Sequence, residues 1–161
     1  MKKILKLHKL YKAYRFFFWS FLEKKLFWKA FFWMIFAKIA IPTFAFSRLQ
    51  RYLGEVSSDQ DFPVEAAADR LKIKQVRTAI ARASKILPFH CQCLVTAICA
   101  RKLLKDLGCS PRLYLGVAKE AKEKESLNKG PGLMAHAWVK LGDQWIVGKS
   151  ETAFTVVKIF A

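Results

Sequence analysis

Two side chains in this sequence have the types and the settings that nucleophilic catalysis requires. Cys93 opens an apolar run over 93–104 whose composition predicts a helix, and His136 lies later, in the strand-like stretch 135–139. A helix N-terminus carries partial positive charge, which favours the thiolate form of a cysteine. An imidazole can serve first as a base and then as an acid. The pair predicts acyl-transfer or peptide-bond chemistry.

The other cysteines are weaker candidates. Cys91 precedes the expected helix and competes for the role of nucleophile, Cys99 is expected in the core, and Cys109 follows the helix as a structural residue. Any free cysteine can also simply pack, because this residue type is among the most buried. His90, Cys91 and Cys93 are closely spaced, but zinc sites favour Cys-x-x-Cys with a matching second pair. We therefore expect no metal, and without a glycine-rich phosphate loop we expect no cofactor.

The charge of the chain is concentrated near its beginning. At 161 residues the chain has the length of one domain with an appendage, and its formal charge is +17. Residues 1–52 carry twelve Lys and Arg against the single acid Glu23, which gives +11 of that total, and 16 of the 23 aromatic residues. Basic and aromatic side chains together suit a membrane surface at least as well as nucleic acid.

Two helices are expected in this basic, aromatic region. Residues 2–22 have an amphipathic pattern, whereas 26–46 are apolar and borderline in length for a bilayer span. Lys29 and Lys38 disfavour a span, and Pro42 would break or kink the helix. The favoured interpretation is a helix pair that packs on the domain. Peripheral membrane contact comes second, and we expect no nucleic acid.

The cysteine distribution indicates the compartment. All four cysteines lie within 91–109, whereas disulfide-linked secreted domains usually spread them along the chain. No compact apolar segment is followed by a small-residue cleavage site of the signal-peptide type. We expect a cytoplasmic protein, with any membrane contact made through residues 1–53.

Downstream of residue 53 the pattern predicts helices first and strands later. The expected helices cover 64–71, 74–87 and 93–107, and Gly108 is expected just past the end of the third. The expected strands cover 112–117, 136–141, 144–147 and 154–160, with a turn at Gly142-Asp143 and a charged loop over 119–132. This order predicts an α+β fold in which the Cys93 helix packs on an antiparallel sheet. It also divides the chain into a helical region, 1–53, and a catalytic domain, 54–161.

Four stretches together resemble the leader peptidases of lasso-peptide biosynthesis, the transglutaminase-like B proteins. They are 88–104, 113–117, 135–138 and 154–157, in the family's order and at its approximate spacing. The resemblance implies a transglutaminase-like, papain-like cysteine peptidase core with Cys93 as nucleophile and His136 as base. It also implies that the enzyme removes the leader from a ribosomally made precursor peptide.

The resemblance also implies partners. In some members a leader-recognition domain is fused at the N-terminus, but residues 1–53 lack the strands that such a domain needs. The implied arrangement is a stand-alone peptidase that works with the precursor peptide, a separate leader-binding protein and a lasso cyclase. Two alternatives stay open: a transglutaminase-like acyl transferase, and a non-enzymatic basic protein that binds membranes or nucleic acid.

The third catalytic residue is not evident. The family's triad includes an acid near the position that Gly148 occupies. If Gly142-Asp143 forms the turn, Asp143 lies seven residues from His136, roughly 23 Å at ~3.3 Å per residue, which is out of reach. The same register places position 149 or 150 opposite the histidine. The groups left to orient the imidazole are Ser150, Glu151 and a backbone carbonyl.

Overall fold

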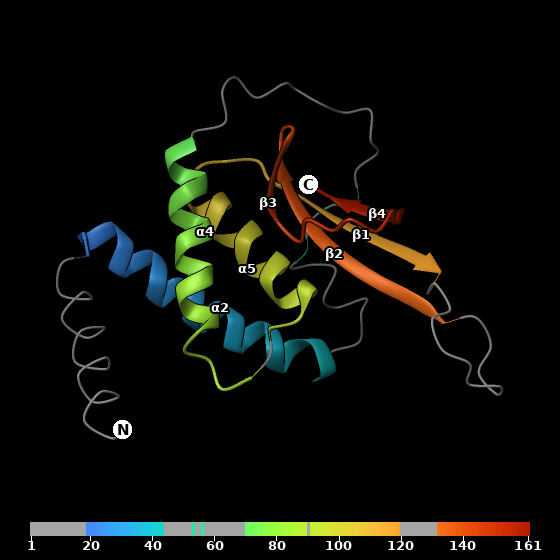
Figure 1. Ribbon diagram of the computed structural model, residues 1–161. Helices are drawn as coiled ribbons and strands as arrows, with labels where there is room; N and C mark the ends of the chain where they lie inside the picture. The colour runs from blue at the N-terminus through green and yellow to red at the C-terminus, as the bar shows by residue number, and fades with distance from the viewer. Residues whose placement is uncertain (1–18, 44–52, 54–55, 57–69, 90, 120–131) are drawn as a thin grey trace, which may run out of the picture.

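The computed structural model describes residues 19–43, 53, 56, 70–89, 91–119 and 132–161. Within them, helices α2 (Phe21–Thr43), α4 (Arg70–Ser84) and α5 (Cys93–Asp106) precede strands β1 (Arg112–Lys119), β2 (Leu133–Leu141), β3 (Gln144–Val147) and β4 (Thr155–Phe160). Figure 1 shows the helices gathered on one side of the sheet. The α+β prediction is confirmed. Most of the helix expected over 64–71, of the charged loop over 119–132 and of the helix expected over 2–22 lies outside the described residues. Residues 70 and 71 belong to α4, which runs without a break through 72–73, so the expected separation between helices 64–71 and 74–87 is wrong.

The strands form an antiparallel sheet in the order β3-β2-β1-β4. The predicted hairpin is confirmed: Leu141 pairs with Gln144 across the Gly142-Asp143 turn. Strand β2 begins at Leu133, three residues before the expected start at His136, so it extends well beyond its short partner β3.

Each inner helix has the apolar spacing that a core face requires. In α4, Ile73, Val76, Ile80 and Ala83 recur at three- and four-residue intervals and are buried. The expected helix over 74–87 is shifted, because α4 begins at Arg70 and ends at Ser84, before Pro88 is reached. Arg77 of α4 donates hydrogen bonds to the carbonyls of Trp145 and Ile146, which fixes β3 beside the helix.

The end of α5 follows the sequence prediction. Gly108 has a φ of 75°, and its N–H donates to the Lys105 carbonyl at 3.0 Å. The N–H of Cys109 donates to the Leu104 carbonyl at 3.0 Å. Together these bonds form a Schellman motif, in which the glycine tolerates the left-handed conformation that ends the helix.

Helix α2 begins earlier than the sequence prediction, at a capping box. The Glu23 N–H donates to the Ser20 hydroxyl at 3.2 Å, and the Ser20 N–H donates back to the Glu23 carboxylate at 3.3 Å. The same carboxylate accepts from Arg82 of α4 at 3.4 Å. By length and composition α2 could cross a membrane, a test that core helices also pass.

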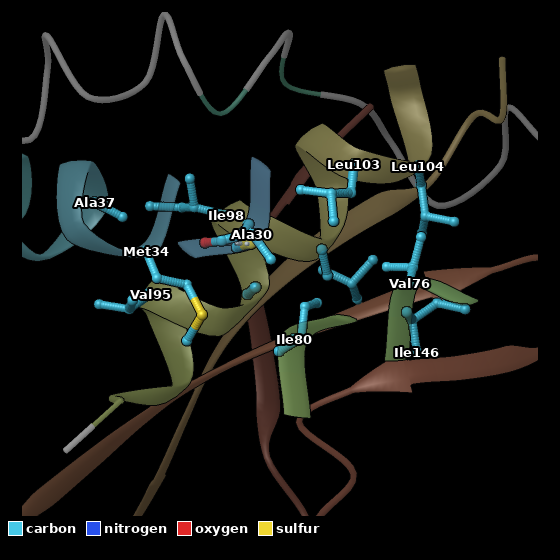
Figure 2. Close-up of a cluster of buried hydrophobic side chains, with 14 of the residues drawn as sticks. Ala30, Met34, Ala37, Val76, Ile80, Val95, Ile98, Leu103, Leu104 and Ile146 are labelled. Carbon is cyan, nitrogen blue, oxygen red and sulfur yellow. Dashed lines mark hydrogen bonds between the residues drawn. The ribbon is translucent and has the colours of Figure 1, made fainter. Parts of the chain in front are cut away.

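The inner face of α2 packs closely on α5 and α4. Small residues at Ala30 and Ala37, with Met34 between them, form the contact that Figure 2 shows against Val95 and Ile98 of α5. The Cys99 thiol lies 3.6 Å from the Ala30 carbonyl oxygen, which shows how closely the two helices approach. Helix α2 therefore shares one core with α4, α5 and the sheet.

The sheet has two different faces. Side chains from alternate strand positions, among them Leu113, Val139 and Phe160, belong to the core beneath the helices. The other face carries a separate aromatic cluster that no described helix covers. Its members are Tyr114, Trp138, Trp145, Phe154 and Ile159.

An ion pair joins α2 to the end of α5. The Asp106 carboxylate accepts from the Lys29 ammonium at 2.6 Å and lies 3.4 Å from the Lys102 ammonium. Burial raises the pKa of Asp106, but the hydrogen bond and charge of Lys29, assisted by Lys102, outweigh it and leave the pKa below its ordinary value of 3.8.

We expect Asp106→Asn to lower the free energy of unfolding by about 1 kcal/mol at pH 7. A lowered folded-state pKa stabilises the protein above the unfolded-state pKa, and that stability is lost as the pH falls through the folded value. The difference between the variant and the parent should therefore vanish in acid, as measured by urea unfolding between pH 7 and pH 2. Asp143→Asn, at the exposed hairpin turn, is the control. An equal loss at every pH would contradict the ion-pair explanation.

Candidate active site

Cys93 is the first residue of α5. The preceding residue, Gln92, is extended (φ −64°, ψ 155°) and its side chain makes no capping hydrogen bond, and the first turn of the helix contains no acid. The first N–H groups of α5 are therefore not occupied by a side-chain cap, and the positive end of the helix is not neutralised. Such N–H groups can bind an oxyanion that forms beside the thiol.

The other cysteines are placed less favourably for chemistry. Cys99 is fully buried, and burial, with a smaller contribution from Cys91, raises the pKa of its thiol far above the ordinary value. A thiol in this setting is inert, which agrees with its predicted place in the core. Cys91 is half-buried, and its thiol lies 3.8 Å from the Phe89 carbonyl. Cys109 is half-buried at the end of α5.

The imidazole of His136 is held by a backbone group. Its Nε2 lies 2.8 Å from the Gly148 carbonyl oxygen. Because a carbonyl oxygen can only accept, this bond holds the hydrogen on Nε2 and leaves Nδ1 as the nitrogen that can accept a proton. The ring also stacks on Phe154 at 4.8 Å and on Trp138 at 6.0 Å between centroids.

A glycine opposite the histidine makes room for these rings. Gly116 pairs with His136 across β1 and β2. A Cβ at Gly116 would lie 2.8 Å from the Trp138 ring and 3.0 Å from Phe154. The missing side chain therefore lets the aromatic residues pack directly on the sheet beside the imidazole.

A cavity of about 260 Å³ opens beside His136. Aromatic rings line one part of it, and most of the other lining residues belong to the segment that follows β3. The lining residues are His136, Trp138, Trp145, Gly148, Ser150, Glu151, Thr152, Ala153 and Phe154. Its size and mixed lining suit one side chain of a peptide.

Comparison with protein families matches residues 33–158 to a model described as the transglutaminase-like superfamily. That match covers most of the chain. The chain belongs to the transglutaminase-like superfamily. No curated protein and no solved structure matches it. The predicted transglutaminase-like core is thereby confirmed, and this superfamily commonly includes cysteine peptidases and acyltransferases. The boundary expected after residue 53 stays a prediction.

Gly148 occupies the position at which the family's triad has an acid, and the backbone there leaves no room for any side chain. Gly148 has a φ of 76°, and a Cβ there would lie 2.5 Å from the Ala137 carbonyl oxygen and 2.9 Å from the Trp138 Cα. Of the groups expected to orient the imidazole, the backbone carbonyl is the one that contacts the ring.

The hairpin has the expected register, but its pairing ends before it reaches His136. The register shifts by one residue between Val139 and Lys140, and strand β3 ends at Val147, which pairs with Val139. The chain leaves the sheet at Gly148, so neither position 149 nor position 150 pairs with the histidine. Asp143 lies in the turn at the far end of β2, as predicted.

The structure places the two candidate catalytic residues on packed elements without joining them. Helix α5 packs on β2, and Ala137 and Val139 of β2 belong to the core that also contains the helix. His136 instead shares the opposite face with Trp138. Within the described residues no hydrogen bond links the Cys93 thiol to the His136 ring, and Cys93 does not line the cavity. Their catalytic pairing stays a prediction.

Sequence reasoning missed three features of this site: the stacking partner Phe154, the close approach at Gly116, and the identity of the orienting carbonyl. A glycine inside a strand is a known indication of close backbone or side-chain approach, so Gly116 could have been noticed. The carbonyl had no sequence signal, because every residue has one.

We expect Gly148→Ala to lower the free energy of unfolding by about 2–4 kcal/mol. An alanine at positive φ is strained, and its Cβ would also clash with the Ala137 carbonyl. Gly108→Ala is the matched control, because Gly108 has nearly the same φ (75°) but nothing within 4 Å of its Cβ position. Urea unfolding of both variants separates the cost of the positive φ, which both share, from the cost of the clash with the Ala137 carbonyl. Equal losses of unfolding free energy would show that the clash contributes nothing.

Proposed function

We propose that this protein is a cysteine peptidase that removes the leader from a ribosomally made lasso-peptide precursor. Membership of the transglutaminase-like superfamily supports catalysis by a cysteine nucleophile. The resemblance to lasso-peptide leader peptidases supports a precursor peptide as the substrate, and it covers residues 88–104, 113–117, 135–138 and 154–157. The observation that carries the proposal is the bond from His136 to the Gly148 carbonyl, because it leaves Nδ1 as the base. A separate leader-binding protein presents the precursor, and a cyclase uses the product.

The proposed reaction has two steps. Nδ1 of His136 takes the proton of the Cys93 thiol. The resulting thiolate attacks the carbonyl carbon at the leader–core junction, and the N–H groups at the start of α5 bind the oxyanion that forms. His136 protonates the departing core amine as the C–N bond breaks, which leaves the leader on Cys93 as a thioester. His136 then takes a proton from water, which attacks the thioester and releases the leader carboxylate.

This reaction requires the thiol and the ring to meet in the substrate complex. Because the ring lies on the face of the sheet opposite α5, the ring or the start of β2 has to turn toward α5 in that complex. The beginning of β2 is the exposed part of the site: Leu133 and Met134 are 73% and 41% accessible, and β3 does not extend beside them. A peptide that packs along this segment would lie next to His136.

We expect Cys93→Ala to abolish leader cleavage, by about a thousandfold or more, because the nucleophile is lost. The assay is mass spectrometry of the precursor, incubated with the full chain and the leader-binding protein. Cys91→Ala and Cys99→Ala should remain active. Full activity in Cys93→Ala would exclude the assignment, and loss only in Cys91→Ala would move it to Cys91. Joined rather than cleaved products would identify an acyl transferase.

We expect His136→Ala to lose cleavage, whereas Glu151→Gln and Ser150→Ala keep it. The reason is that the group hydrogen-bonded to the imidazole is the Gly148 carbonyl, whereas Ser150 and Glu151 only line the same cavity. Initial rates at saturating precursor test this directly. If Glu151→Gln were as inactive as His136→Ala, the carboxylate would be the third catalytic group and the carbonyl would not.

A further inference from the structure

The outward side of α2 is as apolar as its buried side. Its large exposed side chains recur at three-, four- and seven-residue intervals, so they form one stripe along the helix. This outer stripe consists of Phe21 (84% exposed), Trp28 (47%), Phe32 (62%), Phe36 (39%) and Ile39 (60%). The Trp28 and Phe32 rings stack at 5.8 Å and an angle of 27°, so adjacent members are in contact.

A helix that is apolar on every side is normally covered on every side. The inner side of α2 is covered, because Leu26, Ala30 and Met34 pack against α4 and α5. No described residue covers the outer stripe. A contiguous exposed patch of this kind indicates a binding surface.

The charge of this part of the sequence indicates what the stripe binds. Lys25 lies on the stripe and is exposed. The single acid of residues 1–52, Glu23, is already bonded to Ser20 and Arg82, and the sequence of that region carries +11. An apolar stripe that carries an exposed lysine, in a region of basic sequence, complements an anionic bilayer surface. A second copy of the chain fits less well, because a symmetric interface would bring like charges together.

We propose that the outer stripe of α2 docks this protein on an anionic membrane, with the helix axis in the plane of the interface. A transmembrane orientation would have to expose the side of α2 that packs on α4 and α5, and would break the Lys29–Asp106 ion pair. Figure 1 shows α2 on the helical side of the molecule. The aromatic face with His136 lies on the other side of the sheet and points away from the lipid. The proposal does not depend on the peptidase activity.

The test is cosedimentation of the full chain with vesicles. We expect binding to vesicles of equal phosphatidylglycerol and phosphatidylcholine, weaker binding to phosphatidylcholine alone, and weakening by salt. Phe32→Glu should weaken binding to the anionic vesicles by about tenfold or more, because one large apolar side chain no longer enters the interface. Val157→Glu is the matched control: Val157, on β4, is also 62% exposed, and the change in charge is the same.

Three results would overturn the proposal. They are no binding to anionic vesicles, equal weakening by Phe32→Glu and Val157→Glu, and self-association that Phe32→Glu abolishes without vesicle binding. Both substitutions are at exposed positions, and circular dichroism checks that each variant is folded. Lys25→Glu tests the charge separately and should weaken anionic binding while leaving the weak binding to neutral vesicles unchanged.

Discussion

Helix α5 is packed on two sides, against α2 on one and the sheet on the other, and the positions of both candidate catalytic residues depend on that packing. Small side chains make it possible: Ala30 and Ala37 on α2, and Ala97 and Ala100 within α5, are all essentially inaccessible. Because backbones can approach closely only where side chains are small, the helix is fixed in height and rotation. Its first residue, Cys93, is partly buried and packs against the same core.

The sheet separates the helical core from the aromatic cluster on its other face. Alternation along β2 gives one set of side chains to the helical core and the other to the aromatic cluster around Trp138. His136 belongs to the second set, and its ring is fixed by stacking and by one backbone hydrogen bond. The helical layer thus bears the nucleophile candidate and the outer surface of α2, while the base candidate and its cavity face the opposite direction.

Local sequence signals were enough for much of the fold. The apolar spacing of α4, the Gly142-Asp143 turn and the terminating Gly108 each depend on a few neighbouring residues, and all three were predicted. The start of α2 was also a local signal, the Ser20–Glu23 capping box, but the prediction did not use it. The end of β3 could not be predicted in this way. It depends on the positive φ of Gly148 and on its contact with Ala137, which only the folded chain brings together.

The hydrogen bond between His136 and the Gly148 carbonyl makes the orientation of the imidazole insensitive to most side-chain substitutions nearby. The imidazole is oriented by a main-chain oxygen, which every amino acid supplies, so no single codon encodes the orienting group. Alanine scanning of residues 149–152 would leave that oxygen in place, and the glycine at 148 is required for the backbone path and not for a side-chain function. The orientation of the His136 imidazole therefore depends on the path of the backbone at Gly148, and only a change in that path would alter it.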